Sequence, residues 1–259
     1  MSTRSRRRWI ELSLTLASPF VLLAIWEALS RTGAIDRRFW PEPTSLLGTF
    51  WELLREDDLL GDIRISTLRI LGGFMLGAIP GIFLGLAMGL FWPVRVFVMP
   101  IAAAIYAVPK IAVLPLVIIA FGTGEASKLA IVALSIFFLV VLNTMAGVLQ
   151  IDRSFRDVAR NLGASPFQTF VTVALPGALP SIFTGLRLAL GFALIVIVGA
   201  EFLSPRKGGI GDLIWQSWQI YAIEKMFVGL IITGVMGWAL TLALDLIERF
   251  ALPWKPVDS

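Results

Sequence analysis

Long apolar runs dominate the pattern of hydrophobic and polar positions along the 259 residues of the chain. A bilayer core of about 30 Å needs roughly 20 apolar residues of helix to cross it. Six runs reach that length: Leu12–Leu29, Ile65–Phe91, Val96–Phe121, Leu129–Leu149, Ile182–Leu203 and Met226–Ile247. They are continuous and do not alternate at every second residue, so they do not fit barrel strands. The pattern predicts an all-α integral membrane protein with about six transmembrane helices.

The composition narrows the function classes. Hydrophobic residues make up 57% of the chain and charged residues 15%, whereas an ordinary soluble domain is about 25% charged. This excludes a soluble globular enzyme. The chain has no histidine and no cysteine, which excludes zinc sites built on those ligands, disulfides and catalytic histidine or cysteine. We therefore expect no metal on this chain.

The charges around the runs predict the topology. Residues 1–11 form a basic segment, which favours a cytoplasmic N-terminus; its arginines are Arg4, Arg6, Arg7 and Arg8. Six spans then return the tail, residues 251–259, to the cytoplasm. Ala28 and Ser30 faintly resemble a signal-peptidase site, but the long apolar run and the neighbouring Glu27 favour an uncleaved anchor.

Pro43–Arg64, between the first two spans, is mixed in character. Its apolar residues recur at helical spacing: Leu46, Leu47, Phe50, Leu53 and Leu54. This spacing is typical of an amphipathic helix on the outer membrane surface, although a packed loop fits as well. Residues 12–64 are thus predicted to hold the first helix and an external segment, and residues 65–250 the transmembrane core.

A stripe of small residues runs along the second span. Glycines recur there at every fourth position: Gly73, Gly77, Gly81, Gly85 and Gly89. Because glycine removes side-chain bulk, another helix can approach this stripe closely. The spacing predicts a helix-packing surface, and it fits a contact inside the chain or between two copies. Pro80 lies within the stripe and can kink the helix.

Several polar residues lie inside the apolar runs, where charges are costly and usually face a cavity or a partner. The third span contains Lys110 beside Pro109, with Tyr106 one turn earlier; Lys110 has either a structural role at a kink or a role in a pathway. For Asn143 and Thr144 the alternative role is a hydrogen bond between helices, and for Glu201 it is a salt bridge at the membrane interface. Asp245 lies near the inner end of its span, where its side chain can simply reach towards water. The candidate pathway residues are Tyr106, Lys110, Asn143, Thr144 and Glu201.

Ile151–Pro180 interrupts the apolar pattern with the features of a helix–turn–helix elbow. One apolar stripe is formed at helical spacing by Ile151, Phe155, Val158 and Leu162. Gly163 is a natural helix stop, and Ser165–Pro166 is a natural cap and restart. On physical grounds the elbow either docks into a groove of a partner or rests on lipid.

The elbow resembles the cytoplasmic "EAA" loop of bacterial ABC importer permeases. The resemblance rests on DVARNLGAS (157–165) followed by LPGALP (175–180). Asp157 stands where the family has Glu and Val158 where it has Ala, whereas Ala159 and Gly163 match. The likeness covers roughly Pro43–Trp254. LPLVIIAFGTGEASK (114–128), IFTGLRLALG (182–191) and GAEFL (199–203) resemble the subgroup that imports nitrate, sulfonates, taurine or bicarbonate. VPKIA (108–112) is also similar to permeases for thiamine-precursor pyrimidines.

This resemblance implies a type I ABC importer permease in a bacterial inner membrane. Two permease copies would form a homodimeric pathway for a small anion, to which the positive charge of Lys110 would be suited. Two ATPase subunits would carry ATP and Mg²⁺, and an extracytoplasmic solute-binding protein would deliver the solute. The elbow Arg153–Phe170 would transmit ATPase motion. The coupling residues implied are Arg153, Arg156, Asp157, Val158, Ala159, Arg160, Gly163, Ala164 and Ser165.

The chain has no GxxxxGK[ST] motif, so it lacks the loop that binds the phosphates of ATP, and we expect no cofactor and no enzyme activity on it.

Two other function classes are weaker. A stand-alone secondary transporter would leave the elbow without a role, and no internal repeat is visible. An intramembrane enzyme would need a carboxylate pair or a Ser–Lys dyad, and Lys110 has no serine one turn away.

Overall fold

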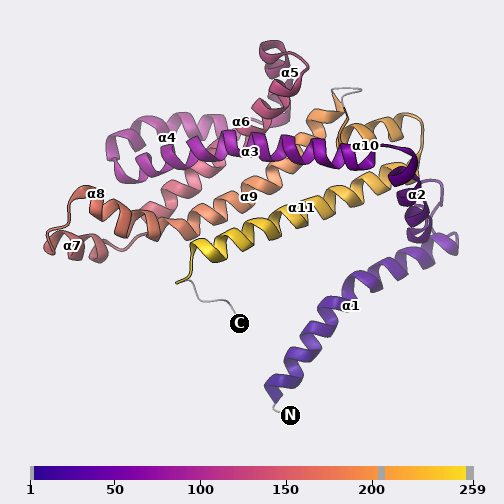
Figure 1. The fold of residues 1–259 in the computed structure, drawn as a ribbon, viewed down its shortest axis with the longest axis horizontal. Coiled ribbons are helices and arrows are strands. Elements are labelled where there is room, and N and C mark those ends of the chain that lie inside the picture. The colour runs from indigo at the N-terminus through magenta and orange to yellow at the C-terminus, as the bar shows by residue number, and fades with distance from the viewer. Residues whose placement is uncertain (1–2, 204–207, 255–259) are drawn as a thin grey trace. The chain divides into compact units, whose positions relative to one another are not determined.

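The computed structural model describes residues 3–203 and 208–254, without the side chains of residues 3–13, 16, 153 and 156. Within these ranges every regular element is a helix (Figure 1). The helices are α1 Thr3–Arg31, α2 Pro43–Glu56, α3 Leu59–Leu90, α4 Trp92–Ala107, α5 Lys110–Phe121, α6 Glu125–Leu149, α7 Arg153–Asn161, α8 Pro166–Thr169, the π-helical turn η1 Phe170–Ala174, α9 Leu175–Phe202, α10 Ile210–Gln219 and α11 Ile223–Ala251.

Four of the described helical segments are long and apolar enough to cross a membrane, and a bent pair of helices makes a possible fifth span. The four are Leu59–Leu90, Glu125–Leu149, Pro166–Phe202 and Ile223–Ala251. The first predicted run, Leu12–Leu29, lies in α1, part of which is outside the described side chains, so its crossing stays a prediction. The all-α membrane fold is confirmed.

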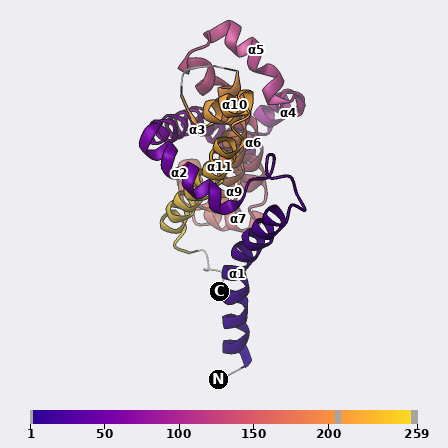
Figure 2. The ribbon, with the colours of Figure 1, turned by 90° about the vertical axis from the view of Figure 1, so that its right-hand side faces the viewer.

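The third predicted span was wrong as a single helix. α4 and α5 meet at an angle of 98° (Figure 2). Pro109 has no N–H to continue the helix, and a residue before proline is pushed towards extended backbone; Val108 has φ −72° and ψ 128°. The bent pair is therefore a broken span or a re-entrant loop.

The chain divides into two compact units, Met1–Leu60 with Leu213–Ile231, and Gly61–Asp212 with Ile232–Ser259. In the first unit α2 is amphipathic, as its spacing predicts, and it buries Leu46, Thr49 and Leu53. Thr49 donates a hydrogen bond to the Glu224 carboxylate at 2.9 Å. The rings of Trp26 and Phe227 lie 5.5 Å apart. These contacts join α1, α2 and the start of α11.

The second unit is built on close contact between α3, α6 and α9, which lie side by side (Figures 1 and 2). The five glycines of the stripe all face α6 of the same chain. A Cβ on Gly77 would lie 2.5 Å from the Ala133 carbonyl oxygen, and one on Gly85 would lie 2.6 Å from Val141 O. On the other side of α6, a Cβ on Gly185 of α9 would lie 2.6 Å from that of Asn143. Larger residues at these positions would force the helices apart.

Candidate functional site

The elbow α7–α8 connects the end of α6 to the start of α9, and local capping shapes it. The Asp152 carboxylate accepts a hydrogen bond from the Ser154 amide at 2.8 Å, which begins α7 and holds the pKa of Asp152 below its ordinary value. Gly163 follows α7 with φ +78°, a left-handed conformation that favours glycine. Ser165 and Gln168 form a reciprocal capping box at the start of α8.

The elbow exposes most of its apolar stripe. Ala159 is buried against its own chain, whereas Leu162 is 81% exposed. Phe155, Val158 and Phe167 are also exposed. A Cβ on Gly163 would meet open space, so only its backbone conformation, not a neighbour in this chain, calls for glycine. Among the coupling residues, the side chains of Arg153 and Arg156 lie outside the described residues. The exposed side chains of Phe155, Val158, Leu162 and Phe167 form an apolar surface that the described part of the chain leaves uncovered.

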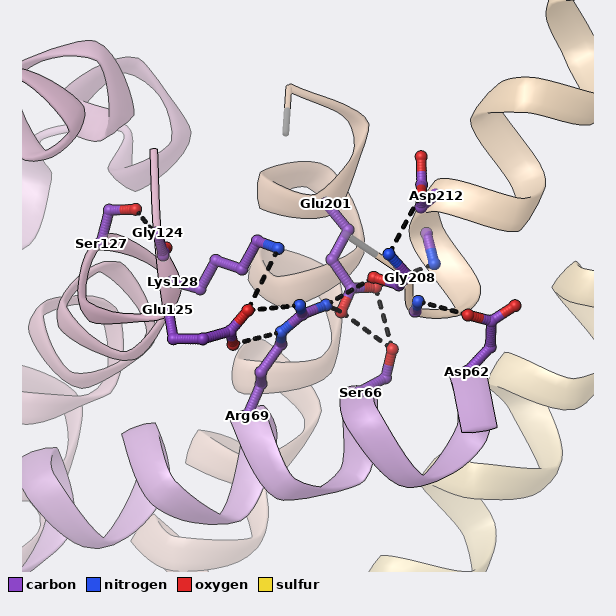
Figure 3. Close-up of polar contacts among 12 residues, drawn as sticks. Asp62, Ser66, Arg69, Gly124, Glu125, Ser127, Lys128, Glu201, Gly208 and Asp212 are labelled. Carbon is purple, nitrogen blue, oxygen red and sulfur yellow. Dashed lines mark hydrogen bonds and ion pairs between the residues drawn. The ribbon is translucent and has the colours of Figure 1, made fainter. Parts of the chain in front are cut away.

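A buried ionic network lies at the opposite end of α6 and α9 (Figure 3). Arg69 of α3 is 3% exposed and donates to Glu201 Oε1 from Nη1 at 2.7 Å. Its Nε and Nη2 donate to the two Glu125 oxygens at 2.7 and 2.6 Å. Ser66 also donates to both oxygens of Glu201 at 2.9 Å. The fully buried Glu201 carboxylate is thereby paired and hydrogen-bonded.

The same network holds the segment that begins α10. Gly208 and Gly209 have φ +68° and +114°. Gly208 accepts from Arg69 through its carbonyl oxygen, and the Gly211 amide donates to Glu201 Oε2 at 2.9 Å. A Cβ on Gly209 would lie 2.5 Å from Glu201 Oε1, so glycine is needed there for both conformation and space. Glu201, predicted as a pathway residue, thus lies in a closely packed contact between α3, the end of α9 and the start of α10.

Lys110 lies at the break between α4 and α5, and its ammonium group donates to backbone carbonyl oxygens at the end of α4 and in the break. Its Nζ donates to the carbonyl oxygens of Ile105, Tyr106 and Val108 at 2.6, 3.1 and 2.8 Å. Ile105 O is the acceptor that an N–H at position 109 would use in a continuous helix, and Pro109 has none. Ile105 O also accepts a hydrogen bond from the Val108 amide at 3.2 Å, so the ammonium adds a second bond to this carbonyl at the helix end. Tyr106 is exposed, with its ring centroid 5.8 Å from the Lys110 Nζ.

Asn143 and Thr144 lie in the last third of α6, where this helix contacts both α9 and α3. The Asn143 amide donates to Leu139 O in its own helix at 2.8 Å, and its Cβ faces Gly185 of α9. Thr144 is fully buried, and its Cβ faces Gly85 of α3. The five candidate pathway residues thus fall in three separate places, and the structure does not bring them together as one site.

Sequence reasoning missed two arginines, Arg69 and Arg187. In the second unit, Arg187 of α9 forms ion pairs with two residues of α11, Asp245 and Glu248, each with a shortest distance of 2.6 Å. Asp245 is therefore ion-paired rather than simply snorkelling. The available signal was an arginine inside an apolar run, since such a charge needs a partner.

Among the described residues no group of three or more acidic, histidine or cysteine side chains could hold a metal ion.

Comparisons with known proteins agree with this architecture. The profile of a family described as "Binding-protein-dependent transport system inner membrane component" matches residues 77–254. The chain is 35% identical over 252 residues to SsuC of Bacillus subtilis, which is named for transport of aliphatic sulfonates; the match covers 97% of this chain and 90% of SsuC.

Two further relatives and one solved structure extend the likeness. The chain is 31% identical to the taurine transport permease TauC of Escherichia coli, over 98% of this chain and 94% of TauC. It is 30% identical to the nitrate import permease NrtB of Leptolyngbya laminosa, over 90% and 85% of the two chains. It also matches a chain of the inward-facing MetNI methionine ABC transporter with a TM-score of 0.66, at 19% identity, over 74% of this chain and 95% of that one. The last match shows the fold alone.

Proposed function

Because this chain belongs to the family of binding-protein-dependent transport system inner membrane components, we propose that it forms the translocation pathway of an ATP-driven importer for a small anion. It is a transport subunit and not itself an enzyme. The observation that carries the proposal is 35% identity to a sulfonate permease along 97% of the chain.

The substrate we favour is a sulfonate or a similar small anion. The relatives are named for aliphatic sulfonates, taurine and nitrate, which all carry a sulfonate or nitrate group. These names do not favour a thiamine-precursor pyrimidine.

Two copies of the chain would enclose the pathway, both termini would lie in the cytoplasm, and a solute-binding protein would deliver the anion from outside. ATP and Mg²⁺ would be bound by two ATPase subunits. The elbow would dock on each ATPase, and the uncovered apolar side chains of Phe155, Val158 and Leu162 support this assignment. ATPase closure would then move the elbows as rigid bodies and alternate the access of the pathway.

An uptake experiment tests the substrate. A strain that lacks this chain is complemented with it, and the uptake of labelled ethanesulfonate, taurine, nitrate and a hydroxymethylpyrimidine is compared. We expect restored uptake of at least one of the three anion-bearing solutes, and loss of that uptake when the partner ATPase is inactivated. Uptake of the pyrimidine alone would overturn the substrate class. Uptake that continues without the ATPase would overturn the importer.

A matched pair of elbow variants tests the coupling. Leu162→Asp places a charge on the exposed apolar stripe, and Asn161→Asp places the same charge one position earlier on the exposed surface. We expect Leu162→Asp to reduce ATP-dependent uptake by about tenfold, equivalent to roughly 1.4 kcal/mol of docking energy, with Asn161→Asp close to wild type. Equal uptake by the two variants would contradict a docking role for the stripe.

A further inference from the structure

Arg187 lies near the middle of α9, which runs from Leu175 to Phe202. At about 1.5 Å per residue it is roughly 18 Å from the first residue and 22 Å from the last. Within the apolar run Ile182–Leu203, Arg187 is five residues from the first residue, so it lies about 7–8 Å inside the end of the run that is nearer the elbow. Its guanidinium therefore needs partners or water at that depth.

The guanidinium has partners, but they do not cover it. Nε and Nη2 donate to Asp245 Oδ1 at 3.0 and 2.6 Å, and Nη2 also donates to Glu248 Oε2 at 2.6 Å. The side chain of Arg187 nevertheless remains 40% exposed, and that of Asp245 37%. Because charges inside a membrane face a bundle interior or a water-filled cavity rather than lipid, this exposed surface is expected to face water.

Donors are left over on the exposed side. A guanidinium has five N–H groups, and the bonds above use Nε and Nη2. Among the residues that the structure describes, none accepts a hydrogen bond from Nη1 of Arg187. The two N–H groups of Nη1 can each donate a charge-assisted hydrogen bond to an oxygen of a sulfonate, a nitrate or a carboxylate. The two carboxylates beside it weaken its attraction for an anion without abolishing it.

Two other cations of the apolar runs are differently engaged, and Lys128 beside them is only 1% exposed, with its Nζ 3.8 Å from Glu125 Oε1. Lys110 donates to three backbone carbonyls at the α4–α5 break, so its ammonium is occupied in holding that break. Arg69 is only 3% exposed and donates to two carboxylates and a carbonyl. Arg187 combines depth, exposure and remaining donors, which none of these does.

We propose that Arg187 is a specificity-determining residue of the translocation pathway, and that its Nη1 group receives the passing anion while Asp245 and Glu248 keep the binding weak. Weak binding suits transport, because a solute held tightly would not leave. The inference rests on the proposed function, since it needs a pathway that carries anions. It names a different cation from Lys110 as the one that selects them.

The test uses the intact importer reconstituted in proteoliposomes, with labelled ethanesulfonate as the probe and ethyl methyl sulfone as its uncharged analogue. Arg187→Gln removes the charge at similar size, and Arg187→Lys keeps it. Leu188→Gln is the control, because Leu188 is the next residue and is also exposed. We expect Arg187→Gln to lower the maximal uptake rate by about tenfold or more, since a charge-assisted hydrogen bond is lost. Arg187→Lys should recover a large part, and Leu188→Gln should match wild type.

Equilibrium binding supplies the second readout. In the purified full-length chain in lipid nanodiscs, ethanesulfonate should bind weakly, Arg187→Gln should weaken it further, and Asp245→Asn should strengthen it. The sulfone should not compete. These opposite signs are not expected if the cluster only holds α9 to α11.

The outcomes separate the two proposals. If wild type imports ethanesulfonate and Arg187→Gln imports it equally well, the role of Arg187 is wrong while the importer stands. If Arg187→Gln breaks the complex into monomers, Arg187 is an interface residue and the inference fails. If wild type neither binds nor imports any anion, the proposed substrate class and the inference fail together.

Discussion

Two clusters of the second unit share a motif and differ mainly in the exposure of the arginine, whereas their second carboxylates show the reverse contrast, with Glu125 56% and Glu248 9% exposed. Each joins one arginine to two carboxylates from other helices. Arg69 is 3% exposed, and its partner Glu201 is fully buried. Arg187 is 40% exposed, and its partner Asp245 is 37% exposed. Ion pairing therefore does not distinguish a structural charge from a functional one. Burial does, because a buried group has no room for a solute.

The two clusters also differ in how they are bonded. Arg69 uses Nε, Nη1 and Nη2, and its neighbours Ser66 and Gly211 supply further hydrogen bonds to Glu201. These bonds tie α3 to α6, α3 to the end of α9, and the start of α10 to the end of α9. Arg187 joins only α9 and α11. We therefore expect the Arg69 cluster to contribute to stability and the Arg187 cluster to transport.

The largest expected effect is the loss of stability on changing Arg69→Met. This variant leaves the Glu201 carboxylate buried without its cation, which costs about 3–5 kcal/mol. The free energy of unfolding can be measured by denaturing the protein in mixed detergent micelles. Arg64→Met is the matched control, because Arg64 is exposed in the same helix and should change stability by about 0.5 kcal/mol or less. Equal losses in the free energy of unfolding of the two variants would show that the buried network does not stabilise the contact between these helices.

A smaller loss is expected for Glu201→Gln. Glutamine keeps the size and one acceptor oxygen, but the bonds from Arg69, Ser66 and Gly211 lose their charged acceptor. We expect a cost of about 1.5–3 kcal/mol by the same measurement. Combined with Arg69→Met, the two changes should cost less than the sum of the single changes, because they act on one network. Strict additivity would mean that Arg69 and Glu201 do not interact.

The sequence predicts regular features of this fold well. Spacing alone identifies the glycine stripe of α3 as a packing surface, since every fourth residue falls on one helix face. The elbow is predicted equally well, because Gly163 and Ser165 carry local signals that need no distant partner. The family resemblance, which the comparisons confirm, rests on the same segment.

Long-range pairing could not be predicted in this way. Arg69 and Glu201 are 132 positions apart, and Arg187 and Asp245 are 58 apart. Both arginines lie in apolar runs whose average hydropathy hides a single charge. The third span was misjudged for a related reason. Hydropathy treats Val96–Phe121 as continuous, whereas the missing N–H of Pro109 breaks the helix and Lys110 donates to three carbonyl oxygens at the break.

A third variant brings the comparison to the exposed cluster. Arg187→Met should cost about 1–2 kcal/mol in the same unfolding measurement, because water can replace the guanidinium at the partly exposed Asp245 but Glu248, which is 9% exposed, loses its cation in a nearly buried place. It should nevertheless impair anion uptake strongly. A loss of stability as large as that of Arg69→Met would remove the distinction between the clusters.

The smallest expected effect concerns salt, and it separates the clusters without reference to transport. At about 1 M salt the Debye length falls to roughly 3 Å, and exposed charges are screened much more than buried ones. The coupling energy between Arg187 and Asp245, obtained from a double-mutant cycle with Arg187→Met and Asp245→Asn, should therefore decrease between low and high salt. The coupling between Arg69 and Glu201 should change much less, because both side chains are shielded from solvent ions. If the two couplings fell equally, water and ions would reach both clusters, and burial could not be what gives Arg69 and Arg187 different roles.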